Sequence, residues 1–149
     1  MIDGVVVTPL KRIGDERGQV MHMLRSDSPR FHGFGEIYFS TVNPGAVKGW
    51  HRHARTINNY AVPAGRARFV LYDERDGSPT WGTVQDVMLG GDDYALLTVP
   101  PLVWYAFAAV GGEPALIANC ASLPHDPAEG ERLDIADSRI PYDWATKGQ

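Results

Sequence analysis

Alternating apolar and polar positions predict short β-strands along most of this chain. In Arg66–Asp73, successive side chains fall on two different faces, which is typical of a half-buried strand. Ala115–Ala121 is apolar at nearly every position and favours a strand buried on both faces. Glycine- and proline-rich turns separate such segments about every eight to twelve residues, which predicts an all-β sandwich or barrel. The other predicted strands are Val5–Leu10, Gln19–Leu24, Glu36–Val42, Val47–His53, Ile57–Val62, Thr83–Leu89, Tyr94–Val99 and Val103–Val110.

Length and composition indicate one domain that covers residues 1–149. A chain of 149 residues, 44% of them hydrophobic, can bury a single core, and no repeat or linker divides it. We expect short irregular N- and C-terminal segments around the barrel. Asp126–Glu131 is interpreted as a solvated loop, whereas Ile140–Trp144 is expected to pack back on the barrel.

The charge balance restricts the classes of partner. With 14 Lys and Arg against 18 Asp and Glu, the net charge is −4, which argues against nucleic acid or an acidic membrane. No apolar run approaches the ~20 residues of a membrane helix, and the N-terminus lacks the pattern of a signal peptide. Cys120 is the only cysteine, so no internal disulfide can form and a cytoplasmic location is expected.

The candidate chemistry lies in Lys48–His53, which contains two histidines one residue apart. In a strand, residues i and i+2 point to the same face, so His51 and His53 are expected to enter the same space. Two inward histidines on a barrel wall suit either proton transfer or metal binding. The alternative interpretation is a pair of solvated histidines at a strand end.

Five short motifs follow one another along nearly the whole chain. They are Asp15–Gly18, Lys48–His51, Asp73–Gly82, Val99–Phe107 and Ile140–Trp144. Together they resemble the dTDP-4-dehydrorhamnose 3,5-epimerase family, whose members are cupin jelly rolls acting on nucleotide-linked 4-keto-6-deoxy sugars. The resemblance therefore implies a cupin jelly-roll β-barrel and a sugar-nucleotide substrate.

The resemblance also implies roles for individual residues. His51 matches the base that removes a proton next to the ketone, while a donor holds the enolate oxygen. His53 is its neighbour or a second base. Arg17 matches an arginine that contacts the nucleotide diphosphate, for which a guanidinium fork is suited. Lys48 replaces a family arginine and keeps the positive charge without the fork.

The chain departs from the family at the groups that assist the base. The family's late tyrosine acid has no counterpart in Cys120–His125, and the aspartate that pairs with the base matches no position up to Gln149. A family lysine corresponds to Asn58, and a family histidine corresponds to Tyr105. We interpret Tyr105 as a substitute proton donor and Asn58 as a donor to the enolate oxygen. A single epimerisation or a ketone–alcohol isomerisation needs fewer groups than a double epimerisation.

Two alternative functions follow from the same residues. Sugar 3,4-ketoisomerases are related cupins with a His-x-His pair that His51 and His53 resemble. A non-catalytic cupin that binds a sugar nucleotide would explain the missing acid, lysine and aspartate.

A metal site is a third interpretation. The spacing of Gly45, the histidine pair and Gly65 resembles the first metal-binding motif of cupins. However, Asn58 stands where the acidic ligand is expected, and Tyr105 stands where the second motif has a histidine. Zinc and iron sites usually need three or more protein ligands, so no metal is expected. His125 would contribute only if the C-terminal segment folded over the barrel mouth.

The resulting hypothesis is a cofactor-independent epimerase or isomerase in deoxysugar or polysaccharide biosynthesis. A homodimer is expected because a small jelly roll exposes sheet edges, which pairing covers. The candidate catalytic residues are His51, Tyr105 and His53, and the candidate substrate contacts are Arg17, Lys48, Asn58, Arg68 and Arg75.

Overall fold

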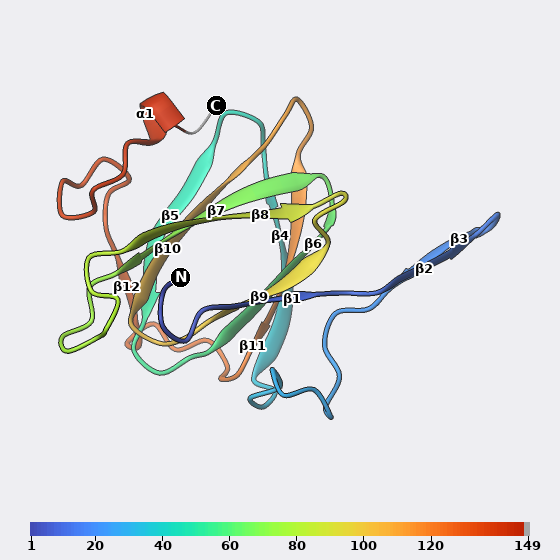
Figure 1. Ribbon diagram of the computed structural model, residues 1–149, viewed down its shortest axis with the longest axis horizontal. Helices are drawn as coiled ribbons and strands as arrows, with labels where there is room; N and C mark the ends of the chain where they lie inside the picture. Colours follow the sequence, from blue (N-terminus) through green and yellow to red (C-terminus); the bar gives the residue numbers. More distant parts are fainter. Residues whose placement is uncertain (148–149) are drawn as a thin grey trace.

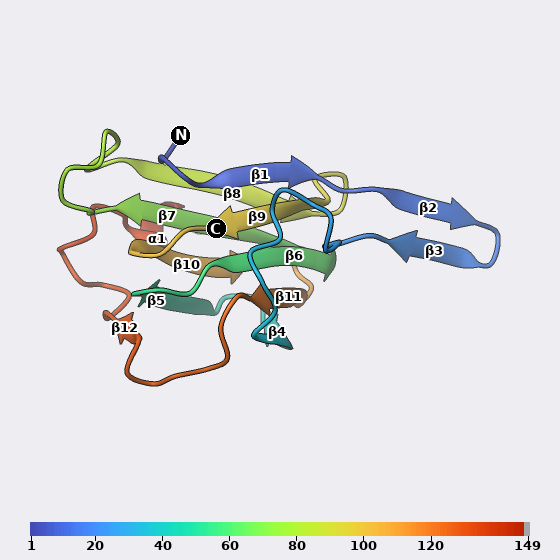
Figure 2. The same cartoon turned by 90° about the horizontal axis from the view of Figure 1, so that it is seen from below.

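The computed structural model describes residues 1–147, which form two facing antiparallel sheets (Figures 1 and 2). The strands are β1 (Val6–Pro9), β2 (Arg12–Asp15), β3 (Gly18–Met21), β4 (Glu36–Val42), β5 (Val47–His53), β6 (Asn58–Ala64), β7 (Arg66–Asp73), β8 (Val84–Gly90), β9 (Ala95–Val99), β10 (Val103–Ala109), β11 (Ala115–Ala121) and β12 (Gly130–Arg132). A short helix, α1, covers Trp144–Lys147. One sheet has the order β1-β9-β6-β11-β4 and the other β12-β5-β10-β7-β8, while β2 and β3 form a separate hairpin.

The hydrophobic pattern locates most of these strands correctly. The predicted strands Glu36–Val42, Arg66–Asp73 and Ala115–Ala121 are β4, β7 and β11. The pattern misses two short strands, β2 and β12, whose residues are largely exposed and therefore carry no apolar alternation. The prediction of an all-β fold is confirmed.

The core lies between the sheets, where apolar side chains from both sheets meet, among them Phe69, Leu71, Leu97 and Ile117. Burial of this apolar surface is the main force that holds the sheets together.

A second apolar cluster covers the outer face of β5, β10 and β7. There Trp50 and Trp104 are fully buried together with Ile140 and Trp144 of the C-terminal segment. The prediction that Ile140–Trp144 packs on the barrel is therefore confirmed. The prediction of a half-buried β7 is confirmed for residues 66–69 and wrong for Val70 to Asp73, which the same cover buries on both faces.

The β2–β3 hairpin projects away from the two sheets in both ribbon views (Figures 1 and 2). Its Ile13 and Val20 side chains are 58% and 61% exposed. Within residues 1–147, no helix is both long enough and apolar enough to span a membrane.

The strand that carries the histidine pair lies unusually close to β10 at Gly49. A Cβ atom at Gly49 would lie 2.4 Å from the Cβ of Ala106, and the φ angle there is +139°. Only glycine adopts this backbone easily. The pairing register shifts at this point, so that His51 pairs with Tyr105 while Ala106 pairs with Gly49. Such a bulge changes the direction of neighbouring side chains, and here Trp50 enters the outer cluster while His51 faces the barrel interior.

Candidate active site

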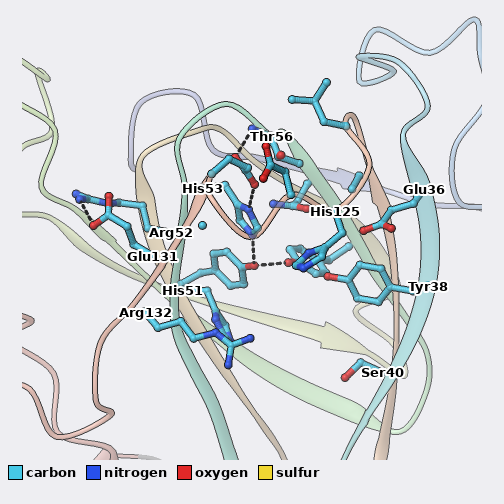
Figure 3. Close-up of a pocket in the computed structure, with 18 of the residues that line it drawn as sticks. Glu36, Tyr38, Ser40, His51, Arg52, His53, Thr56, His125, Glu131 and Arg132 are labelled. Carbon is cyan, nitrogen blue, oxygen red and sulfur yellow. Dashed lines mark hydrogen bonds and ion pairs between the residues drawn. The ribbon is translucent and has the colours of Figure 1, made fainter.

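A cavity of about 750 Å³ lies inside the barrel (Figure 3). Side chains of β4, β6 and β11 line it from one sheet, and those of β5, β10 and β12 line it from the other. Residues 123–127, between β11 and β12, complete the wall. Phe107 and Ile117 belong both to this wall and to the core, so the cavity is continuous with the packed interior.

His51 and His53 both line this cavity, as the strand spacing predicts. The pKa of His51 is lowered to about 4, chiefly because burial disfavours the charged imidazolium. The positive charges of Arg132, His53 and Lys48 lower it further. His51 is therefore a neutral imidazole at pH 7, and it can accept a proton.

His53 is held by a carboxylate from a distant part of the chain. Its Nδ1 is hydrogen-bonded to one carboxylate oxygen of Glu129, and the other oxygen accepts hydrogen bonds from the backbone amides of Arg55 and Thr56 at 3.1 and 3.3 Å. Burial alone would raise the pKa of Glu129, but these hydrogen bonds outweigh it and lower the pKa to about 2. The ionised carboxylate keeps a proton on Nδ1 of His53 and leaves Nε2 to face Tyr105.

Three tyrosines continue from His53 across the cavity. The Tyr105 hydroxyl lies 3.1 Å from His53 Nε2 and 2.7 Å from the Tyr60 hydroxyl. Burial raises the pKa of both phenols, so both remain protonated at neutral pH. Tyr38 lies on the opposite sheet, and its ring points into the cavity (Figure 3). Its hydroxyl accepts a hydrogen bond of 2.9 Å from Asn119 Nδ2.

Two cations flank His51 inside the cavity, Lys48 and Arg132 (Figure 3 shows Arg132). Within residues 1–147, no carboxylate forms an ion pair with either of them. Arg52 also lines the cavity, but its guanidinium is bound to Glu131 at 2.7 Å. The wall therefore offers positive charge to an anionic ligand although the protein is acidic as a whole.

Five of the eight residues predicted from sequence meet in this cavity, namely His51, His53, Tyr105, Lys48 and Asn58. Asn58 is nearly fully buried, and its Oδ1 accepts a hydrogen bond of 3.0 Å from Asn119.

Arg17, Arg68 and Arg75 do not line the cavity. Arg17 lies at the tip of the β2–β3 hairpin, where it pairs with Asp15 at 2.6 Å. Arg75 is bound to the buried carboxylate of Asp73 at 2.9 Å, which gives it a structural role. Arg68 lies on the same face of β7 as Val70, whose side chain belongs to the outer cluster, so Arg68 faces away from the barrel interior.

Sequence reasoning misses three residues of the site, and it named a fourth, His125, only as a metal ligand on the condition that the C-terminal segment folds over the barrel mouth. Glu129 belongs to the stretch interpreted as a solvated loop, yet it is 8% exposed and contacts His53. Tyr38, His125 and Arg132 also line the cavity. Their positions carry no motif, and the only available signal was the lack of a carboxylate partner for the histidine pair.

The residues that replace metal ligands take part in other interactions. The Tyr105 hydroxyl is engaged by His53 and Tyr60, and the Asn58 amide is engaged by Asn119. Over the described part of the chain, no group of three or more His, Cys, Asp or Glu side chains is arranged to hold a metal ion.

The fold and the interior cavity define the class of protein as a cupin jelly-roll barrel. ChmJ, a 3'-monoepimerase from Streptomyces bikiniensis solved in complex with dTDP-quinovose, shares this fold with a TM-score of 0.87. It is 19% identical, and the match covers 98% of this chain and 77% of ChmJ. The family model of dTDP-4-dehydrorhamnose 3,5-epimerase matches residues 1–149, and the chain belongs to this family. The family and fold expected from the sequence motifs are thus confirmed.

Individual relatives agree with this membership. A dTDP sugar isomerase from Desulfovibrio desulfuricans is 50% identical with a TM-score of 0.95, over 97% of this chain and 92% of that one. A probable low-salt glycan biosynthesis epimerase of Haloferax volcanii is 35% identical over 144 residues, covering 95% of this chain and 89% of the relative. The spore coat polysaccharide biosynthesis protein SpsL of Bacillus subtilis is 31% identical over 149 residues, covering 99% of each chain. The family is one of sugar-nucleotide epimerases that serve glycan and polysaccharide biosynthesis.

Proposed function

We propose that this protein is an epimerase or isomerase of a nucleotide-diphosphate-linked 4-keto-6-deoxy sugar. The reaction begins with removal of a proton from a carbon next to the ketone. The carbonyl acidifies that carbon because the resulting carbanion is an enolate, so the step needs no cofactor. The observation that carries the proposal is a neutral His51 inside the cavity, flanked by Lys48 and Arg132.

His51 is the proposed base. Its ring nitrogens take part in none of the side-chain hydrogen bonds found within residues 1–147, so a lone pair is available to the substrate. Proton transfer requires the substrate carbon to approach within about 3 Å of this nitrogen. Asn58 is the proposed donor to the enolate oxygen, because Asn119 occupies its Oδ1 and leaves its NH2 group for another acceptor. Such a donor stabilises the charge that develops during proton removal.

Lys48 and Arg132 are the proposed diphosphate contacts. Both line the cavity beside His51, and Arg132 has a guanidinium that can bind two phosphate oxygens at once. Arg17 lies outside the cavity of its own chain, and its contact with the diphosphate stays a prediction.

A sugar 3,4-ketoisomerase is the second candidate function. The observation that favours it is that His51 and His53 lie on the same wall, two residues apart. Two imidazoles on one side of the ring can take a proton from one carbon and deliver it to the next carbon.

Deuterium exchange tests these functions. The protein is incubated in deuterium oxide with a nucleotide-linked 4-keto-6-deoxyhexose, and NMR follows the carbons next to the ketone. Deuterium incorporation with inversion supports the epimerase, and a ketone that moves by one carbon supports the isomerase. In either case, the His51→Ala variant is expected to lose exchange, whereas a variant of the exposed His32, His32→Ala, is expected to keep it. Binding without exchange contradicts both and indicates a non-catalytic cupin.

We also propose a homodimer, and we retain the cytoplasm as its expected location. Support for the dimer comes from exposed apolar side chains on the projecting hairpin and on the edge strand β4, where Ile37 and Phe39 are 54% and 66% exposed. Sedimentation is expected to give twice the chain mass of 16.4 kDa. A monomer at micromolar concentration would contradict this.

A further inference from the structure

A series of polar groups connects Glu129 with Tyr38 through the wall of the cavity. Glu129 is bound to Nδ1 of His53, and Nε2 of His53 lies 3.1 Å from the Tyr105 hydroxyl. The Tyr105 hydroxyl lies 2.7 Å from that of Tyr60. Burial is the main cause that raises the pKa of Tyr60, and the neighbouring Tyr38 hydroxyl raises it further. The series therefore runs from a carboxylate near β12 to a phenol on the opposite sheet.

The protonation state of His53 sets the direction of these hydrogen bonds. When the imidazole is neutral, its proton is on Nδ1, so Nε2 accepts from Tyr105 and each hydroxyl donates towards His53. When the imidazole is charged, Nε2–H donates to Tyr105, and each hydroxyl then donates outwards towards Tyr38. The ionised carboxylate of Glu129 stabilises the charged form as an ion pair. The series can thus hold one mobile proton.

Only one of the three phenols is accessible to a ligand. Tyr60 and Tyr105 are 2% and 3% exposed, whereas Tyr38 is 42% exposed and lines the cavity. Asn119 donates to the Tyr38 oxygen and fixes its position. Figure 3 shows Tyr38 facing the cavity from the side opposite His51. A sugar ring placed between the two sheets would therefore meet the imidazole on one face and the phenol on the other.

We propose that Tyr38 is the catalytic acid that protonates the enolate on the face opposite His51, and that Tyr60 and Tyr105 resupply its proton from His53. This inference rests on the proposed function. His51 takes the proton of the broken C–H bond, whose electrons form the enolate. The enolate carbon then takes the proton of Tyr38, whose oxygen regains one from Tyr60. Tyr60 is refilled by Tyr105 and Tyr105 by the imidazolium of His53, which becomes neutral. His51 releases its proton to solvent, and His53 regains one from solvent, so no net proton is consumed.

His125 is the other titratable group that could deliver a proton from that side of the cavity, because it also lines the wall. It lies on an exposed segment, and within residues 1–147 no hydrogen bond ties its side chain to the series. Tyr38 is therefore the better candidate, and His125 provides a comparison in the test.

The test separates proton removal from proton delivery in deuterium oxide with a nucleotide-linked 4-keto-6-deoxyhexose. The Tyr38→Phe variant is expected to keep deuterium exchange within about threefold, because His51 is intact. It is expected to lose formation of the inverted product by about 100-fold or more, which is typical of a missing general acid. Tyr60→Phe interrupts the resupply and is expected to slow product formation without affecting exchange. Tyr94→Phe, a tyrosine outside the cavity, is the matched control and is expected to form product normally. His125→Gln is the comparison, and loss of product in that variant while Tyr38→Phe keeps it would overturn the inference.

The outcomes distinguish this inference from the proposed function. Normal product formation by Tyr38→Phe overturns the inference and leaves the proposed function intact. Loss of exchange together with product in folded Tyr38→Phe also overturns it, because Tyr38 would then act before the enolate forms. Absence of exchange and product in the wild-type protein overturns the proposed function and the inference together.

Discussion

Nδ1 of His53 and the carboxylate of Glu129 are in direct contact although 76 residues separate them along the chain. The contact joins the strand β5 to the segment that leads into β12, and β12 in turn pairs with β5. The pairing brings Glu129 to a site where two backbone amides also donate to it. The carboxylate therefore has a fixed position, and it determines which nitrogen of His53 carries the proton.

Glu129→Gln is expected to lower kcat by about 10-fold or more while KM changes little, because the neutral amide stabilises the His53 imidazolium less well. Glu129→Asp should restore part of the rate, and Glu113→Gln, in an exposed turn, is the control. A change in melting temperature with an unaltered kcat would mean that Glu129 has only a structural role.

The low pKa of His51 predicts that the rate of proton removal falls only at unusually low pH, on the acid limb of the pH–rate profile. A base must be neutral to accept a proton, and the pKa of about 4 keeps His51 neutral well below pH 6.5. The rate of deuterium exchange should therefore stay nearly constant between pH 7 and pH 5 and reach half its value near pH 4. Arg132→Gln removes one positive neighbour and should move this limb to higher pH. A limb near pH 6.5 in the wild-type protein would argue against His51 as the base.

Arg132 is also expected to contribute to ligand binding. Arg132→Gln should weaken binding of a nucleoside diphosphate by about 10-fold, because a charge-assisted hydrogen bond to phosphate contributes roughly 1.5 kcal/mol or more. Calorimetric titration measures this effect, and added salt should reduce the difference between the two proteins. Arg66→Gln, which removes an arginine paired with Asp93 at the surface, is the matched control. Equal affinity of the Arg132 variant and the wild type would remove Arg132 from the proposed site.

Gly49→Ala is expected to lower the free energy of unfolding by about 3 kcal/mol, because the new Cβ would overlap Ala106 and the backbone has a positive φ. Chemical denaturation measures the change. Gly112→Ala is a suitable control, since a Cβ there meets no atom within 4 Å. Because Gly49 lies two residues before His51, the variant should also lose activity. An unaltered stability would mean that β5 and β10 can separate at this point at little cost.

Strand prediction succeeds where one face of a strand is buried and fails where both faces have the same environment. β7 alternates clearly, so its bounds follow from the pattern, but its second buried face depends on Ile140 and Trp144, which come about 70 residues later. β2 is exposed along its whole length, and nothing in its residues marks it as a strand.

The residues of the candidate site are likewise divided between those that local strand geometry predicts and those that it does not. His51 and His53 share a face because the strand period is two, and that follows from local geometry alone. Arg17 and Arg75 belong to recognisable motifs but lie outside the cavity, where each pairs with an aspartate two residues before it. A motif identifies the family, whereas the direction of each side chain depends on its neighbours in space.

By itself, the sequence determined the all-β architecture, the family and the inward histidine pair, because these depend on short-range periodicity and on the order of motifs. Tertiary structure alone decided that Glu129 holds His53, that Tyr38 faces His51 and that Arg132 enters the cavity. The physical reason is that these contacts join strands of different sheets or distant segments of the chain. Their formation depends on how the sheets pack, and no local pattern of residues specifies it.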